Sequence, residues 1–180
     1  MEKGFANPAP LGLAAFGMTT VLLNLHNAGF FPLGSMILAM GIFYGGIAQI
    51  IAGIMEWRLG NTFGTVAFLS YGLFWETLVF LLLMGHLGWW PAPAKAAIVA
   101  YLALWGIFTF LMWIALFVGK HKWDLQLVFI TLWILFFLLA IGDALGSASI
   151  KRFAGYEGLV CGSLAIYVAF THIIGGMRKA

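Results

Sequence analysis

The sequence has 180 residues, of which 63% are hydrophobic and 8% are charged, whereas about half of an ordinary soluble domain is apolar and about a quarter is charged. This composition excludes a soluble globular domain and predicts an integral membrane protein. The net charge of +3 comes without a basic cluster interleaved with aromatic residues, so no nucleic-acid partner is expected. No recognisable nucleophile motif is present, and no enzymatic activity is expected.

Long uncharged runs divide the chain into six predicted membrane spans. A spanning helix needs about 20 mostly apolar residues, and the runs place the helices near residues 8–25, 33–54, 62–84, 95–118, 125–142 and 156–173. The connections between these runs are too short to hold a soluble domain. We therefore expect an all-α integral membrane protein in which residues 1–180 form a single six-helix transmembrane transport domain.

The ANPAPLGL stretch opens the first span with two prolines. Pro10 suits a first helical position, where its missing N–H is no loss, although a helix that starts one turn earlier with Asn7 as its cap is also possible. In the first case the backbone N–H groups of Leu11, Gly12 and Leu13 have no partner within the helix. Because a helix start can bind an anion, a small carboxylate would fit there. The alternative is a helix start that binds no ligand.

Polar side chains inside the first two spans usually face other helices or a watery path, because lipid cannot satisfy them. Thr20 and Asn24 share one face of the first predicted helix, and Gln49 follows a row of glycines in the second. Small residues let helices approach closely, and Gln49 could bond across such a contact. These side chains therefore either hold helices together or contact a substrate.

The third predicted span contains Glu76, the only carboxylate deep inside a predicted helix. A charged group at bilayer depth costs at least ~2.5 kcal/mol, so its neutral form is favoured. Glu76 is either a protonatable group on a transport path or a hydrogen-bonded residue that locks neighbouring helices. Asp143 and Glu157 are placed at the outer ends of the last two spans, where solvation and a helix N-terminus account for them.

The first, third and fifth predicted spans run in the same direction across the membrane. Phe16, Tyr71 and Leu132 each fall near the middle of one of these spans. Three bulky side chains at one depth could form a hydrophobic constriction, which controls permeation by size and by dewetting. Ordinary core packing explains the same observation equally well.

The basic residues predict how the protein is oriented. Three of them, Lys95, Lys151 and Arg152, fall on the side opposite the N-terminus. The six on the side of the N-terminus are Lys3, Arg58, Lys120, Lys122, Arg178 and Lys179. Because cytoplasmic loops are richer in lysine and arginine, we expect both termini in the cytoplasm and the chain in the inner (plasma) membrane.

Several sequence blocks resemble the acetate uptake transporter family of the succinate-acetate permease type. They are NPAPLGL at 7–13, YGGIAQIIAGIMEW at 44–57, GNTFG at 60–64 and AFLSYGLFW at 67–75. The resemblance runs from Asn7 to about Thr171. It implies a six-helix membrane protein that moves acetate and related short carboxylates, with succinate as a further candidate. It also implies a homohexamer in which each protomer has its own pore.

The resemblance also assigns roles to individual residues. The hydrophobic gate of the family corresponds to Phe16, Tyr71 and Leu132. The opening motif, as part of the substrate path, corresponds to Asn7, Pro8, Pro10, Leu11, Gly12 and Leu13. The polar stripes of the predicted helices, and not the resemblance, suggest further candidates to hydrogen-bond the acid on either side of the gate, namely Tyr71, Thr20, Asn24, Gln49 and Ser70. Glu76 departs from the family pattern, in which an apolar residue is usual at this position.

These features predict passage of a small acid through a mostly apolar pore. No lysine or arginine lies in the middle of a predicted span, so a bare carboxylate would be costly at the constriction and the acid is expected to cross protonated or partly hydrated. Glu76 is the expected proton-coupling residue. The alternative function is a passive channel for small neutral solutes such as urea or ammonia. A haem protein using His26 and His86 is a third class, but no cofactor and no metal are expected.

Overall fold

The computed structural model describes residues 6–178, so Lys3 and Lys179 lie outside the described residues. All regular structure in this range is helical. The helices are α1 (Ala9–Asn27), α2 (Ser35–Ala39), the π-helix η1 (Met40–Ala48), α3 (Gln49–Arg58), α4 (Thr62–His86), α5 (Lys95–Val118), α6 (Trp123–Leu145) and α7 (Ala148–Met177). Because α2, η1 and α3 follow one another without a break, they make one span, and the described chain has six helices long and apolar enough to cross a membrane.

The six-span, all-α prediction is therefore confirmed, and its boundaries are close for the first four spans. The last span is wrong by eight residues, because α7 begins at Ala148 instead of residue 156. The sequence places charged residues in this region, which suggested a loop. In the structure Lys151 forms an ion pair of 2.8 Å with Asp143 on α6, and the Ser147 side chain caps α7 by accepting from the Ile150 N–H.

Two acidic residues consequently have different surroundings from those predicted. Asp143 lies inside α6 and is paired with Lys151, so it is not a solvated loop residue. Glu157 lies well inside α7, so the N-terminus of that helix does not account for it. Both of its carboxylate oxygens are buried without a hydrogen-bond partner.

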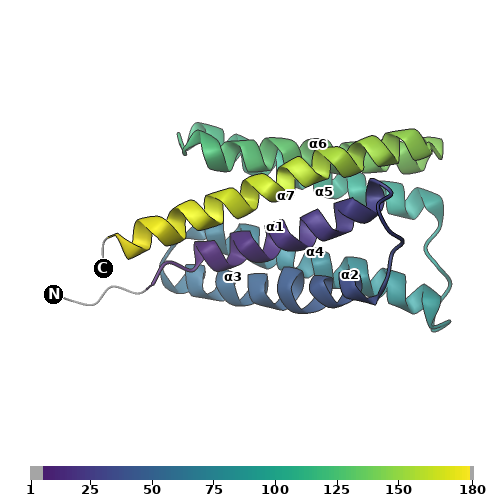
Figure 1. Ribbon diagram of the computed structural model, residues 1–180, viewed down its shortest axis with the longest axis horizontal. Helices are drawn as coiled ribbons and strands as arrows, with labels where there is room; N and C mark the ends of the chain where they lie inside the picture. Colours follow the sequence, from purple (N-terminus) through teal and green to yellow (C-terminus); the bar gives the residue numbers. More distant parts are fainter. Residues whose placement is uncertain (1–5, 179–180) are drawn as a thin grey trace.

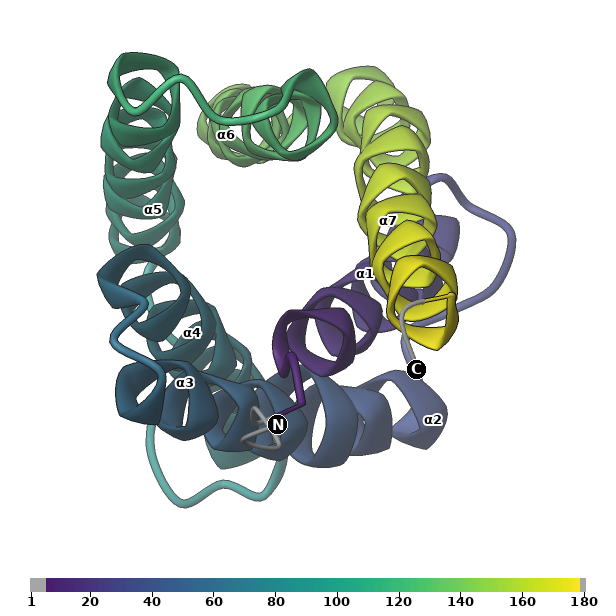
Figure 2. The same cartoon turned by 90° about the vertical axis from the view of Figure 1, so that its left-hand side faces the viewer.

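The spans lie side by side along the long axis of the molecule, and the described chain starts and ends at the same end of the bundle (Figure 1). Viewed from that end, α1, α4, α5, α6 and α7 surround the centre, and the α2–η1–α3 span lies outside α1 and α4 (Figure 2). Helices α1 and α7 pack against each other more extensively than any other two helices. A Cβ added to Gly17 would lie 2.7 Å from the Gly162 carbonyl oxygen, so only glycine permits this approach.

Candidate functional site: a vestibule that ends at a constriction

A cavity of about 250 Å³ extends into the bundle from the end where the described chain starts and ends. We call it the vestibule. Its walls come from the first halves of α1, α4 and α6, from α3, from the α5–α6 connection and from the end of α7. The lining residues are Asn7, Ala9, Leu13, Phe16, Gln49, Glu56, Asn61, Phe63, Gly64, Ala67, Phe68, Tyr71, His121, Leu125, Val128, Phe129, Leu132 and His172.

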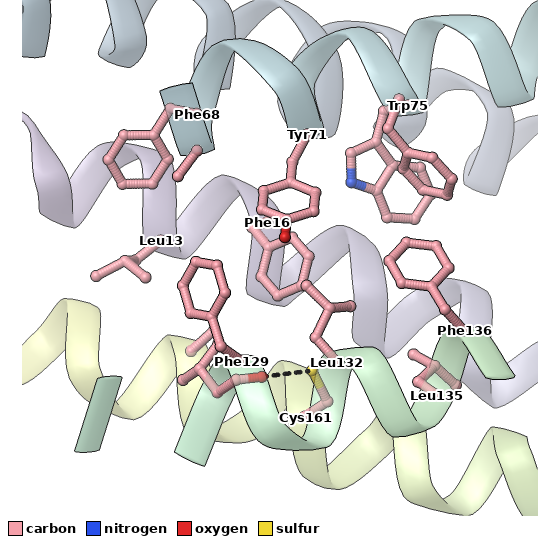
Figure 3. Close-up of a cluster of buried hydrophobic side chains, with 14 of the residues drawn as sticks. Leu13, Phe16, Phe68, Tyr71, Trp75, Phe129, Leu132, Leu135, Phe136 and Cys161 are labelled. Carbon is pink, nitrogen blue, oxygen red and sulfur yellow. Dashed lines mark hydrogen bonds between the residues drawn. The ribbon is translucent and has the colours of Figure 1, made fainter. Parts of the chain in front are cut away.

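The deep end of the vestibule is formed by the three residues that the sequence placed at one depth. Phe16 from α1, Tyr71 from α4 and Leu132 from α6 are all buried. Their side chains meet in the middle of the bundle, where the Phe16 and Tyr71 rings lie 5.9 Å apart and Leu132 approaches from the opposite side (Figure 3). We call this group the constriction. The structure therefore brings the three predicted residues together.

The Tyr71 hydroxyl group is held by a hydrogen bond to Thr109, a residue that was not predicted to belong to the site. The hydroxyl donates to Thr109 Oγ1 at 3.0 Å, and Thr109 in turn donates to the Trp105 carbonyl oxygen at 2.7 Å. Thr109 is fully buried on α5. Tyr71 therefore uses its hydroxyl donor within the protein. A hydrogen bond from a substrate to this hydroxyl stays a prediction.

Replacing Thr109 by valine should leave the Tyr71 hydroxyl buried without its acceptor. An unsatisfied buried hydroxyl costs about 1–3 kcal/mol, so T109V should lower the melting temperature in detergent. The double variant Y71F/T109V removes both partners and should recover much of this loss. Y71F alone is the control, because Thr109 keeps its bond to Trp105. Equal melting temperatures for T109V and the double variant would contradict this account of Tyr71.

The proline entrance does not present free donors. Helix α1 begins at Ala9 with Pro8 as its N-cap. The Asn7 side chain accepts from the Ala9 N–H at 3.0 Å, and the Pro8 carbonyl oxygen accepts from the N–H groups of Leu11 and Gly12 at 3.0 and 3.3 Å. The predicted carboxylate site on these backbone groups is therefore wrong, because the chain satisfies them itself.

Only part of the opening motif reaches the vestibule. Asn7 and Leu13 line it, whereas Pro10 and Leu11 are not among its lining residues. Gly12 is buried, and a Cβ added there would collide with the Phe68 ring, so that ring covers the face on which a ligand was predicted. In this motif, glycine serves close packing between α1 and α4.

Among the predicted polar contacts, Tyr71 lines the vestibule, and so does Gln49. Its amide nitrogen donates to the Gly45 carbonyl oxygen at 2.7 Å, and its Oε1 is buried without a partner. Asn24 instead donates to the Thr20 carbonyl oxygen at 2.9 Å and packs against the backbone of Gly158 on α7. Three of the predicted contacts, Thr20, Asn24 and Ser70, are absent from the vestibule lining.

Glu76 lies on the side of α4 that faces η1. A Cβ added to Gly46 in this π-helix would collide with the Glu76 carboxylate, so the two residues are in close contact. Glu76 is not among the vestibule residues. The structure therefore does not bring the predicted proton-coupling residue to the cavity.

Four polar residues of the vestibule were not predicted from the sequence, namely Glu56, Asn61, His121 and His172. Glu56 accepts from the Asn61 side chain at 2.6 Å, and Asn61 caps α4. An asparagine directly before a helix is a recognisable cap signal, and a glutamate five residues before it could have been noticed. The histidines carry no such signal, because only the fold brings them to the cavity.

The vestibule has no lysine or arginine among its described lining residues. Its polar groups are a carboxylate, amides, imidazoles and one tyrosine within largely apolar walls. Among residues 6–178, no group of three His, Cys, Asp or Glu side chains could hold a metal ion. His26, considered above as a haem ligand, places its Nδ1 3.0 Å from the Phe31 carbonyl oxygen.

Comparisons with known proteins cover nearly the whole chain. Residues 1–178 match the GPR1/FUN34/yaaH family. The succinate-acetate/proton symporter SatP of Escherichia coli K12 is 57% identical over 169 residues, which cover 94% of this chain and 89% of that protein. A solved structure, described as the bacterial acetate channel SatP, matches with a TM-score of 0.94 and 55% identity, and the match covers 97% of this chain and 95% of that one.

More distant relatives are found in fungi. Ammonia transport outward protein 2 of Saccharomyces cerevisiae is 34% identical over 178 residues. The match covers 94% of this chain and 62% of the fungal protein. The six-helix unit described here therefore occurs within longer chains.

Proposed function

The chain belongs to the GPR1/FUN34/yaaH family, and we propose that it moves acetate and related small carboxylates, including succinate, across the membrane. It is a multi-pass protein of the inner membrane. The proposed path runs through the vestibule and the constriction within one chain. We further propose that it has no enzymatic activity and that it assembles as a homohexamer, as the family resemblance implies.

The observation that carries this proposal is the vestibule, which leads from one end of the bundle to three buried bulky side chains. Its volume of about 250 Å³ is below the range of roughly 300–1,000 Å³ that is usual for drug-sized ligands. Such a space suits a solute of a few heavy atoms. The apolar ring at its deep end suits a gate that selects by size and by dewetting.

Charge determines the form in which an acid can pass. A carboxylate deprived of water needs a compensating positive group, and none of the described residues that line the vestibule is a lysine or arginine. We therefore propose that the acid crosses the constriction protonated or partly hydrated. Proton coupling fits this proposal, and the Escherichia coli relative is named as a proton symporter.

A passive pathway for small neutral solutes is the alternative. Two fungal relatives have names that refer to ammonia transport, and a mostly apolar vestibule would also admit a neutral solute. The two functions differ in the solute that the pathway carries. It carries acetate in the first case, and urea or ammonia in the second.

Exchange of labelled acetate in proteoliposomes tests the proposal. The assay uses equal alkaline pH on both sides, where little acid is in the lipid-permeant neutral form, and subtracts the rate of protein-free vesicles. The protein should accelerate exchange, and unlabelled succinate should compete. A rate equal to that of protein-free vesicles, together with accelerated swelling in urea, would favour the alternative.

A further inference from the structure

Glu56 is an almost fully buried carboxylate in the wall of the vestibule. It lies near the end of α3, and 2% of its surface is exposed. A buried carboxylate is costly unless both of its oxygens have partners. Oε2 accepts from Asn61 Nδ2 at 2.6 Å, whereas Oε1 is buried and has no hydrogen-bond partner among residues 6–178. One carboxylate oxygen of Glu56 therefore lacks a hydrogen-bond partner among the described residues.

The orientation of Asn61 shows which oxygen can carry a proton. Asn61 Oδ1 accepts from the backbone N–H of Gly64 at 3.1 Å, and a backbone N–H can only donate. The amide nitrogen of Asn61 must therefore point to Glu56, and Oε2 accepts its hydrogen bond. Oε1 is consequently the oxygen whose hydrogen-bonding capacity is unused and on which we place the proton.

The titratable and charged groups around Glu56 determine whether Oε1 is available to bind a proton. The titratable groups that share the vestibule are Tyr71 on α4, His121 in the α5–α6 connection and His172 on α7. On its own helix Arg58 follows two residues later. The N-terminus of α4, which Asn61 caps, lies next to Glu56, because a Cβ added to Gly64 would come within 2.9 Å of the Glu56 carboxyl carbon. Among the described residues, Oε1 has no hydrogen-bond partner.

We propose that Glu56 is the proton-binding residue of the vestibule and accepts the proton of the carboxylic acid that has passed the constriction. This inference rests on the function proposed above. In this step the O–H bond of the acid breaks, an O–H bond forms on Glu56 Oε1, and the acid leaves through the vestibule as a carboxylate anion. Glu56 then releases the proton to water, and the reverse sequence loads an acid in the other direction. Glu76 takes no part, because it does not line the vestibule.

Infrared difference spectroscopy of the purified protein tests this step directly. Adding isotope-labelled acetate to the wild-type protein should produce a new band of a protonated side-chain carboxyl group, separate from the bands of the labelled ligand. Glu56→Gln should abolish the band, since glutamine cannot bind the proton. Glu56→Asp, which keeps a carboxyl group, should retain it. Glu76→Gln is the matched control and should also retain it, because the carboxylate that it removes lies outside the vestibule.

Two results would overturn the inference. One is a wild-type protein that exchanges acetate without producing the band, and the other is a band that persists unchanged in Glu56→Gln. Either result would leave the proposed function standing. A wild-type protein that does not exchange acetate would instead contradict the proposed function, so the two failures are distinguishable.

Discussion

Replacing both Phe16 and Leu132 by alanine should admit lactate and other larger monocarboxylates. The two side chains meet Tyr71 at the deep end of the vestibule, and removing them widens the ring from two sides. Since a single methylene in an apolar pocket changes discrimination by 10–200-fold, the ratio of lactate to acetate flux should rise roughly tenfold or more. The measurement is exchange of each labelled acid in proteoliposomes, with the protein-free rate subtracted.

The matched control for this prediction is Leu104→Ala. Leu104 lies on α5 with 67% of its surface exposed, and it is outside the vestibule. The same leucine-to-alanine truncation there should leave the flux ratio unchanged. If the double variant kept the wild-type preference for acetate while remaining folded, the constriction would not be the size filter.

Replacing Gly64 by valine should abolish transport. Gly64 lines the vestibule, and a Cβ there would lie 2.6 Å from Asn61 Nδ2 and 2.9 Å from the Glu56 carboxyl carbon. Both contacts are too short, so the valine must displace the Glu56–Asn61 pair and fill part of the vestibule. Acetate exchange should fall to the rate of protein-free vesicles, while the protein still elutes as a folded species in detergent.

Gly175→Val provides the control, because a Cβ at Gly175 on α7 would meet nothing within 4 Å. It introduces the same side chain into a helix without touching the vestibule. This variant should exchange acetate at the wild-type rate. Full activity of Gly64→Val would mean that the solute does not pass the Glu56–Asn61 pair.

The fold was predictable because each span is a long apolar run, and lipid permits little other than helices for such segments. The constriction was predictable for a related reason. Helices of similar length that run in the same direction place their middle residues at one depth, so counting along the chain was enough for Phe16, Tyr71 and Leu132. The start of α7 was not predictable in this way, because the ion pair of Lys151 with Asp143 forms only when α6 and α7 pack together.

The polar part of the site depended on contacts that the sequence does not display. Glu56 ends an uncharged run and resembles a solvated residue at a span end, yet the packing of α3 against the start of α4 buries it. The proline entrance resembled an anion site because its donors have no partner in an ideal helix. In the structure the Pro8 carbonyl oxygen accepts from the N–H groups of Leu11 and Gly12. Counting residues along the predicted helix does not reveal these local hydrogen bonds.

Covalent blocking of the vestibule tests most directly whether the solute passes through it. Leu125→Cys places a thiol in the vestibule wall, and Leu127→Cys places one on the exposed side of α6. Both are made in a Cys161→Ser background, which removes the single native cysteine. After treatment with a bulky thiol reagent, acetate exchange should stop in Leu125→Cys and continue in Leu127→Cys. Continued exchange in a fully modified Leu125→Cys protein would contradict a path through the vestibule.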